Sequence, residues 1–562
     1  MSFMDVIIGT ALLLIIFVAL SGLLRNSLII ASLAKNKAVA TAVAESQMEY
    51  MRSLSYDAVG TVGGIPAGDI PQYATTTNNG LEFVTRTYIE YVDDPKDGLE
   101  EADENGITTD YKRIKVSVTY NAGGMERSVE LISNYAPPGL ETTTGGGTLR
   151  INVVNAVGEG VPGASVTIEN PSTDPAVNLT AFSSDQGIVY LPGAATSTDY
   201  RVTVTKDGYS TAETYERDAT NQNPTPGYLT VVKDQTTTGT FAIDLLTTLT
   251  VRTFSPIATT TWSDTFSDSG NIASESDVSV EGGSVILEGG SGMYSSSGNL
   301  RSTALTPDYL AEWTSASIGA SLPPGTNVRF HVADGGGTLL PDAVLPGNST
   351  GFTTDVDLSA IPEETYTSLS LIAYLETSSA DVTPSLLDWT IVYQRGPVPL
   401  PNVSFSLTGG KTIGSTGGGA PIYKTVLSES TNGSGVRELS LEWDEYEADI
   451  PSYDVVDACN APPYTLAPNS SIDSSLILDD PTAHSVLVSA RTTTGPIEVG
   501  NITLSRTGFS EIVPVSECGA AYFGGVVSAS DYTITASTSG YDDVIVTGIS
   551  VSGQLFYEVI FE

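Results

Sequence analysis

An acidic residue, Asp5, stands near the start of an apolar segment that carries no other charged side chain before Arg25. A carboxylate in lipid or in another apolar medium is costly, so it is expected to have a partner and a function. The first chemistry that the sequence suggests is therefore a charge pair made by Asp5.

A loop rich in carboxylate and amide oxygens covers residues 93–110, DDPKDGLEEADENGITTD. Hard cations such as Ca²⁺ prefer oxygen ligands of this kind, although the loop lacks the strict spacing of an EF-hand. Two interpretations stay open, a Ca²⁺ site or a solvated acidic turn. The candidate ligands are Asp93, Asp94, Asp97, Asp103, Asn105 and Asp110.

The chain has two cysteines, Cys459 and Cys518, and two histidines, His331 and His484. Two cysteines in a long chain do not make a disulfide scaffold, but they can form one bond or stay apart. The histidines are too far apart in sequence to suggest a catalytic triad or a histidine metal centre, and we expect no enzymatic activity.

Asp5 must be positioned by a helix. Residues 6–24 are 19 uncharged, mostly apolar residues, close to the ~20 that cross a bilayer. Apolar residues then continue at helical spacing through Met48 and Met51, which predicts one helix to about Leu54. No basic region precedes the apolar run and no small-residue cleavage site follows it, so a signal peptide does not fit.

The segment MSFMDVIIGTALLLIIFVAL resembles the mature start of type IV pilins and pseudopilins, which have an acidic residue at the fifth position of an apolar helix. The resemblance implies that Asp5 pairs with the N-terminal amine of Met1 on a neighbouring subunit, with Met1 as the mature first residue. The alternative is that Met1 is an initiator and that the fifth position of Asp5 is accidental. The family usually has Glu there, so Asp is a departure. The resemblance also implies local unwinding of the helix at Gly22, where close helix packing is the simpler interpretation because Gly is common in membrane helices. A plain membrane anchor is the alternative, but it does not account for Asp5.

Strand-like runs at residues 81–92, 110–120 and 127–135 predict a small antiparallel sheet, with a hairpin at 121–124. A long helix followed by such a sheet is the order found in a pilin head. We therefore expect a helix at 1–55, a head sheet at 56–140 and a flexible Gly- and Thr-rich linker at 141–148.

A weak repeat fills most of the remaining chain. Residues 149–170 with 200–213 share a strand–turn–strand layout with residues 485–508 and 532–544, and a middle copy is split between 249–255 and 397–409. These units resemble carboxypeptidase regulatory-like or Cna-B-like β-sandwiches. The expected domains are 149–245, 246–256 with 396–480, and 481–562.

The segment that splits the middle copy, residues 257–395, resembles galactose-binding-like jelly rolls in its even strand spacing. That resemblance implies a sugar-binding domain, in which aromatic rings stack on the ligand. A place in the β-sandwich core is the simpler interpretation of each ring. The aromatic candidates are Trp262, Tyr309, Trp313 and Trp389.

Composition limits the class of protein and its partners. The net charge of −42, with 24 Lys and Arg, argues against a nucleic-acid partner. The sequence predicts a multidomain chain, an α+β pilin module followed by all-β sandwiches and an inserted jelly roll. We expect a type IV pilus-like filament subunit at the cell surface, held in the cytoplasmic membrane before assembly. Its expected partners are itself, other pilins and a glycan or host-surface ligand. The alternatives are a minor or tip adhesin, and a non-polymerising anchored protein that binds or cleaves carbohydrate.

Overall fold

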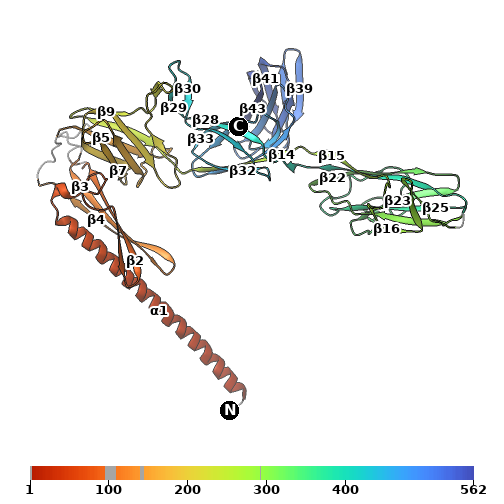
Figure 1. Ribbon diagram of the computed structural model, residues 1–562, viewed down its shortest axis with the longest axis horizontal. Coiled ribbons are helices and arrows are strands. Elements are labelled where there is room, and N and C mark those ends of the chain that lie inside the picture. The colour runs from red at the N-terminus through yellow and green to blue at the C-terminus, as the bar shows by residue number, and fades with distance from the viewer. Residues whose placement is uncertain (1–2, 95, 97–108, 139–144, 291–292) are drawn as a thin grey trace.

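The chain is described by a computed structural model over residues 3–94, 96, 109–138, 145–290 and 293–562 (Figure 1). One long helix, α1 (Phe3–Arg52), precedes a short 3-10 helix (Tyr56–Ala58) and an otherwise all-β chain in the described ranges. A multidomain β protein with one N-terminal helix is the architecture that the apolar N-terminal run and the strand-like runs predict.

The head is the sheet that packs on the second half of α1. Its order is β1-β2-β3-β4, antiparallel throughout. Ala40, Ala44, Met48 and Met51 recur on one face of α1 and are buried against this sheet. The strands are β1 (Tyr73–Asn78), β2 (Leu81–Val92), β3 (Tyr111–Ala122) and β4 (Met125–Tyr135).

Sandwich 1 is the unit formed by β5 to β13. Sheets β13-β5-β8 and β10-β9-β6-β7 enclose one apolar core, and β12 pairs with β9. The strands are β5 (Gly147–Val154), β6 (Ser165–Asn170), β7 (Val177–Phe182), β8 (Ile188–Ala194), β9 (Ser197–Thr205), β10 (Ala212–Glu213), β11 (Asn223–Pro224), β12 (Leu229–Val231) and β13 (Thr236–Ala242).

Sandwich 2 is built from two separate stretches of chain. The strand before the insertion, β14 (Thr247–Ser255), pairs with β27, β32 and β36, all of which follow the insertion. The later strands are β27 (Val398–Pro399), β28 (Ser404–Gly409), β29 (Thr412–Ser415), β30 (Pro421–Tyr423), β31 (Val426–Ser430), β32 (Val436–Leu441), β33 (Asp444–Asp449), β34 (Asp454–Cys459), β35 (Tyr464–Leu466) and β36 (Ser471–Asp479).

The inserted sandwich, residues 258–395, has two larger antiparallel sheets and one two-stranded ribbon. It projects sideways from sandwich 2 (Figure 1). The strands are β15 (Ala258–Asp264), β16 (Ile272–Ser276), β17 (Val278–Glu281), β18 (Ser284–Leu287), β19 (Gly289–Gly290), β20 (Met293–Tyr294), β21 (Ser297–Ser302), β22 (Leu310–Ser321), β23 (Thr326–Asp334), β24 (Val356–Asp357), β25 (Leu369–Thr377) and β26 (Ser385–Arg395).

Sandwich 3 ends the chain, with sheets β40-β37-β43 and β39-β38-β41-β42 around a fourth β core. Its strands are β37 (Ser485–Thr492), β38 (Asn501–Arg506), β39 (Phe509–Pro514), β40 (Ala520–Gly524), β41 (Ala529–Ser537), β42 (Val544–Val551) and β43 (Gln554–Phe561).

Candidate functional site

The first half of α1 is an exposed apolar surface. It extends away from the β domains, with the N-terminus at its far end (Figure 1). Its large apolar side chains that are described are between 45% and 70% exposed: Leu13, Leu14, Ile16, Phe17, Val18, Leu20, Leu23, Leu24, Leu28, Ile29 and Ile30. A soluble monomer rarely exposes a continuous apolar surface of this kind, so it indicates contact with lipid or protein.

The predicted assembly residues lie in this half of α1. Met1 lies outside the described residues, as does the side chain of Asp5, whose backbone is helical. The helix runs through Gly22 without a break, and a Cβ built there would meet nothing within 4 Å. Both packing and unwinding at Gly22 concern an assembled state, so these roles stay predictions.

Within the described residues, one helical stretch, Ile16–Arg52, is long and apolar enough to span a membrane by length and composition. Its most apolar window is not buried within the chain.

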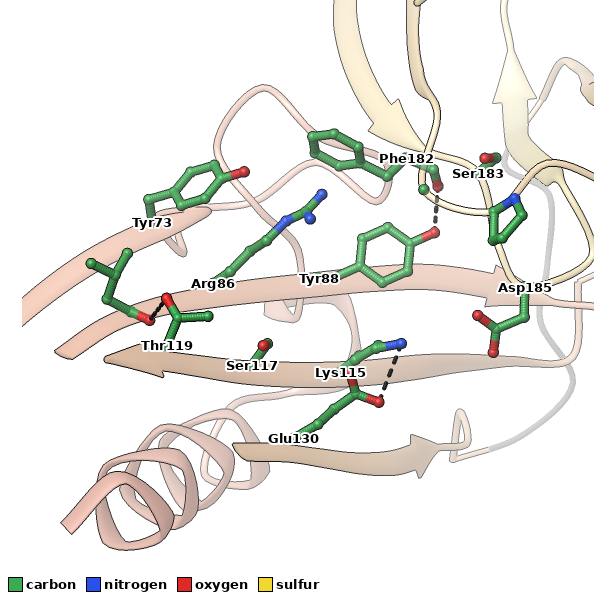
Figure 2. Close-up of a pocket in the computed structure, with 13 residues that line it drawn as sticks. Tyr73, Arg86, Tyr88, Lys115, Ser117, Thr119, Glu130, Phe182, Ser183 and Asp185 are labelled. Carbon is green, nitrogen blue, oxygen red and sulfur yellow. Dashed lines mark hydrogen bonds and ion pairs between the residues drawn. The ribbon is translucent and has the colours of Figure 1, made fainter. Parts of the chain in front are cut away.

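The head and sandwich 1 are in direct contact. The Tyr88 hydroxyl on β2 donates to the carbonyl of Phe182 on β7 (Figure 2). The Arg86 guanidinium lies 4.0 Å from the centroid of the Phe182 ring. Ile65, from the loop that precedes β1, is buried in the core of sandwich 1. Because apolar, cation–π and polar contacts all cross this junction, the head and sandwich 1 are held in one orientation.

A cleft of about 440 Å³ opens at this junction (Figure 2). Aromatic and charged groups line it together, and Lys115 pairs with Glu130 at 3.2 Å on its floor. The lining residues are Tyr73, Val84, Arg86, Tyr88, Lys115, Ser117, Thr119, Glu130, Pro162, Gly163, Phe182, Ser183 and Asp185. No sequence signal marked this cleft, because its walls come from segments about 100 residues apart.

A buried carboxyl, Glu90, lies beside the junction. Burial raises its pKa above the ordinary glutamate value, although its hydrogen bond with Tyr88 and the charge of Arg113 lower it. Burial and the charge of Glu90 likewise raise the pKa of Tyr88. The Tyr88 hydroxyl has one hydrogen, so it donates either to Glu90 or to Phe182. A protonated Glu90 can donate to the hydroxyl and thereby satisfy both contacts.

The acidic loop is described at its two ends. The Asp94 amide donates to the Asp110 carboxylate at 2.5 Å, and the Tyr190 hydroxyl of sandwich 1 donates to Asp93 at 3.4 Å. The other predicted ligands, Asp97, Asp103 and Asn105, lie outside the described residues. Among described side chains, no group of three His, Cys, Asp or Glu residues is placed to hold a metal. The Ca²⁺ site stays a prediction.

The four aromatic candidates fall into two environments. Trp313 and Trp389 are fully buried in the core of the inserted sandwich, where a ligand cannot stack on them. Trp262 is half-buried and stacks on Trp389 at 6.5 Å, while Tyr309 is 52% exposed. Ligand stacking stays a prediction for Trp262 and Tyr309.

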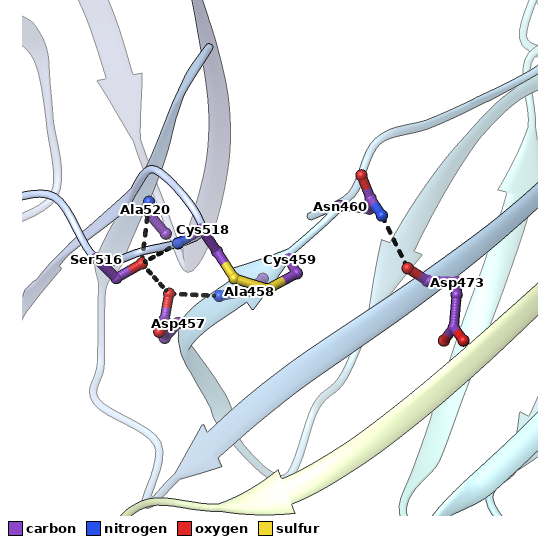
Figure 3. The surroundings of a disulfide bond; sticks show 8 residues. All are labelled: Asp457, Ala458, Cys459, Asn460, Asp473, Ser516, Cys518 and Ala520. Atoms are coloured by element: carbon purple, nitrogen blue, oxygen red, sulfur yellow. Dashed lines mark hydrogen bonds between the residues drawn. A yellow bond between two sulfur atoms is a disulfide. The ribbon is translucent and has the colours of Figure 1, made fainter. Parts of the chain in front are cut away.

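Cys459 and Cys518 form a disulfide with a Cα–Cα distance of 4.9 Å (Figure 3). The bond joins the end of β34 in sandwich 2 to the loop before β40 in sandwich 3. Beside it, the Ser516 hydroxyl donates to Asp457 at 2.7 Å. The sequence left this pairing open, and the structure makes it a covalent link between two sandwiches.

Sequence reasoning missed a charge cluster between sandwiches 1 and 2. Glu442 is buried and accepts from Lys424 at 2.8 Å and from Lys411 at 3.3 Å. Lys424 also donates to the Thr211 carbonyl of sandwich 1 at 2.6 Å. Close by, β11 of sandwich 1 pairs with β29 of sandwich 2. The separation of these groups in sequence left no local signal for the cluster.

The two histidines lie in different domains. The His331 Nδ1 is 2.5 Å from the Asn348 carbonyl in the inserted sandwich, and the His484 Nδ1 accepts from the Gly553 amide at 2.9 Å. Each ring therefore has a local structural partner.

No protein-family model matches the chain, and no curated protein matches it. Among solved structures, the Bacillus anthracis TIE protein matches at 12% identity, covering 87% of this chain and 73% of its own, with a TM-score of 0.15.

Two pilin structures are also similar. BcpA, the major pilin subunit of Bacillus cereus, matches at 9% identity, covering 74% of this chain and 99% of its own, with a TM-score of 0.14. The shaft pilin SpaA from Lactobacillus rhamnosus GG matches at 10%, covering 30% and 86%, with a TM-score of 0.11. Superpositions this weak carry no argument about family or function, so the functional case depends on the chain itself.

Proposed function

We propose that this chain is a subunit of an extracellular type IV pilus-like filament. The observation that carries the proposal is the division of α1 into two halves with different surroundings. Its second half buries Ala44, Met48 and Met51 against the head sheet, while its first half exposes apolar side chains to its surroundings. The exposed half of such a helix can contact lipid before assembly and can pack against other copies of the helix in the filament.

Apolar helix packing supplies the cohesion of the proposed filament, and Asp5 sets the register between subunits. In this mechanism Asp5 pairs with the amine of Met1 on the next subunit, because an unpaired carboxylate is costly in an apolar filament core. The sandwiches then face outward, and the inserted sandwich attaches to a glycan or a host surface through Trp262 and Tyr309. We propose no catalytic role.

The test compares Asp5→Ala with Asp5→Glu in the native host. Loss of one partner from a buried ion pair costs about 3–5 kcal/mol, so Asp5→Ala should lower filament yield by tenfold or more. Asp5→Glu keeps the charge and should retain filaments. Both variants should enter the membrane fraction equally, since the apolar run is unchanged. Undiminished filaments from Asp5→Ala would contradict the mechanism.

A second candidate is a surface protein that is anchored by α1 and never polymerises. The observation that favours it is that the helix is long and apolar enough to span a membrane. Electron microscopy of sheared surface material separates the two, because an anchored monomer gives no fibre. If fibres are present, the ratio of this chain to other subunits distinguishes a main subunit from a minor or tip subunit.

A further inference from the structure

Sandwiches 1, 2 and 3, which we call the stalk, share one feature of topology. In each, the first strand pairs in parallel with the last long strand: β5 with β13, β14 with β36, and β37 with β43. The first two pairs have seven residue pairs in continuous register, and the third has eight. The chain therefore enters each sandwich at one end of this ribbon and leaves at the opposite end.

This arrangement decides how a sandwich responds to tension. Opposed pulls on the two ends of a parallel ribbon slide one strand along the other, so the ladder hydrogen bonds share the load. Opposed pulls at the same end of a ribbon instead open the pairs one after another. Each hydrogen bond contributes a modest free energy, about 0.5–1.5 kcal/mol, so loading seven pairs together resists far more force than loading one.

Sandwich 1 lies on the path of any such force. The covalent chain from the head to the inserted sandwich, and to sandwiches 2 and 3, passes through β5 and β13. Strand pairing between sandwiches 1 and 2 is limited to two residue pairs, Asn223 with Ser415 and Pro224 with Gly414, against seven in the β5–β13 ribbon. Side-chain hydrogen bonds from Asn221 and Lys424 add to this contact. The ribbon is therefore the longer of the two strand pairings, and the covalent chain runs through it.

The inserted sandwich has the opposite geometry. Its first strand, β15, pairs antiparallel with its last strand, β26, from Ala258 with Arg395 to Asp264 with Trp389. Its two chain ends leave side by side, and β14 and β27 hold them together through Ser255 and Val398. Tension applied between the head and sandwich 3 thus passes its base without extending it.

We propose that sandwich 1 is a shear-loaded mechanical clamp that keeps the distal domains connected to the head under tension. The load enters at Gly147 and leaves at Ala242, at opposite ends of the β5–β13 ribbon. This function goes beyond filament assembly, and it holds equally for an anchored monomer. A result that disproves the clamp would therefore leave the proposed filament function unaffected.

Single-molecule pulling on the full chain tests the clamp by changing only the direction of load. Cysteine handles at Ala136 and Ala242 load the ribbon from opposite ends, and handles at Ala136 and Lys233 load it from the same end. All three side chains are exposed, and the two native cysteines are bonded to each other. The contact between the head and sandwich 1 is loaded in both cases, so the comparison isolates the ribbon.

Unfolding of sandwich 1 should lengthen the chain by on the order of 300 Å in both geometries. We expect the rupture force to be at least about twofold higher with handles at opposite ends, because the ladder then breaks together. Handles at Ala136 and Glu562 also load the ribbon from opposite ends, and they introduce no substitution inside sandwich 1. Sandwich 1 should therefore unfold at the same force as with handles at Ala136 and Ala242. Equal forces in the two geometries, or a lower force from opposite ends, would overturn the proposal.

Discussion

Single residues at the junction of the head and sandwich 1 connect protonation to domain contact. Glu90 is buried beside Tyr88, and the Tyr88 hydroxyl reaches across to the backbone of sandwich 1. Burial raises the pKa of Glu90. Arg113, at 3.4 Å from Glu90, lowers this pKa in part, while the charge of Asp185 raises it further. The balance raises the pKa of Glu90, so this carboxyl holds a proton more strongly in the folded protein than in the unfolded chain.

The direction of this shift predicts how stability varies with pH. A raised pKa means that the folded state binds more protons, so the contribution of Glu90 is largest in acid and is lost as pH rises through its folded pKa. Glu90→Gln should remove this loss, because the amide stays neutral. Urea titrations from about pH 4 to about pH 8, read by hydrogen-exchange protection of β2, would measure the difference.

Glu82→Gln is the matched control for that comparison. Glu82 lies on the same strand but is exposed, so its loss should leave the pH profile of the wild type unchanged. A Glu90→Gln profile that runs parallel to the wild type would show that Glu90 does not set the pH dependence of this junction.

Sequence patterns predict some residue roles and miss others for physical reasons. Met48 and Met51 were predicted from helical spacing and are buried. Ala40 and Ala44 are equally buried, but a small residue carries little apolar signal of its own. Glu442 was missed because its partners, Lys411 and Lys424, lie in loops 18 or more residues earlier in the chain, and charged residues are ordinarily exposed.

At the scale of elements, the two halves of α1 have different surroundings on one continuous helix. Its second half completes the core of the head, and its first half exposes apolar side chains, which the proposed assembly would cover with lipid or other subunits. A substitution in one half should therefore affect folding, and a substitution in the other should affect assembly. This separation provides a direct test of the proposed division.

Met51→Ala should destabilise the head by about 2–5 kcal/mol, because it leaves a cavity in a fully buried site. Leu24→Ala should change head stability by less than about 0.5 kcal/mol, since Leu24 is exposed. Filament yield should nevertheless fall for Leu24→Ala. Urea unfolding of the purified chain in detergent and quantification of sheared filaments give the two readouts. Loss of head stability in Leu24→Ala would contradict the division.

The head strands show what local sequence can determine. The range predicted for one strand, 81–92, coincides with β2, because the run is rich in β-branched and aromatic residues and every second side chain from Phe83 to Ile89 is buried. The predicted hairpin is also present, with Gly123 and Gly124 both at positive φ between β3 and β4. The parallel pairs are different, since β5 and β13 lie about 80 residues apart and neither strand carries a signal for the other.

At the scale of the whole molecule, the chain is a stalk with a side arm. The inserted sandwich leaves and rejoins sandwich 2 at neighbouring points, because Ser255 and Val398 face each other across β14 and β27. An insertion with adjacent ends can be removed without separating the strands of its host. This geometry allows the role of the arm to be tested apart from the role of the stalk.

Replacing residues 257–396 with an Asn-Gly turn should leave sandwich 2 folded, since β14 keeps its pairing with β32 and β36. Assembly through α1 should continue, and the filaments should lose attachment to glycan-coated surfaces. Double substitution of Trp262 and Tyr309 by Ala is the matched variant, because it keeps the arm and removes the two candidate stacking rings. Filaments that attach normally without the arm would place the ligand site elsewhere on the chain. Loss of filaments would show that the arm takes part in assembly, which a side arm outside the helical core should not do.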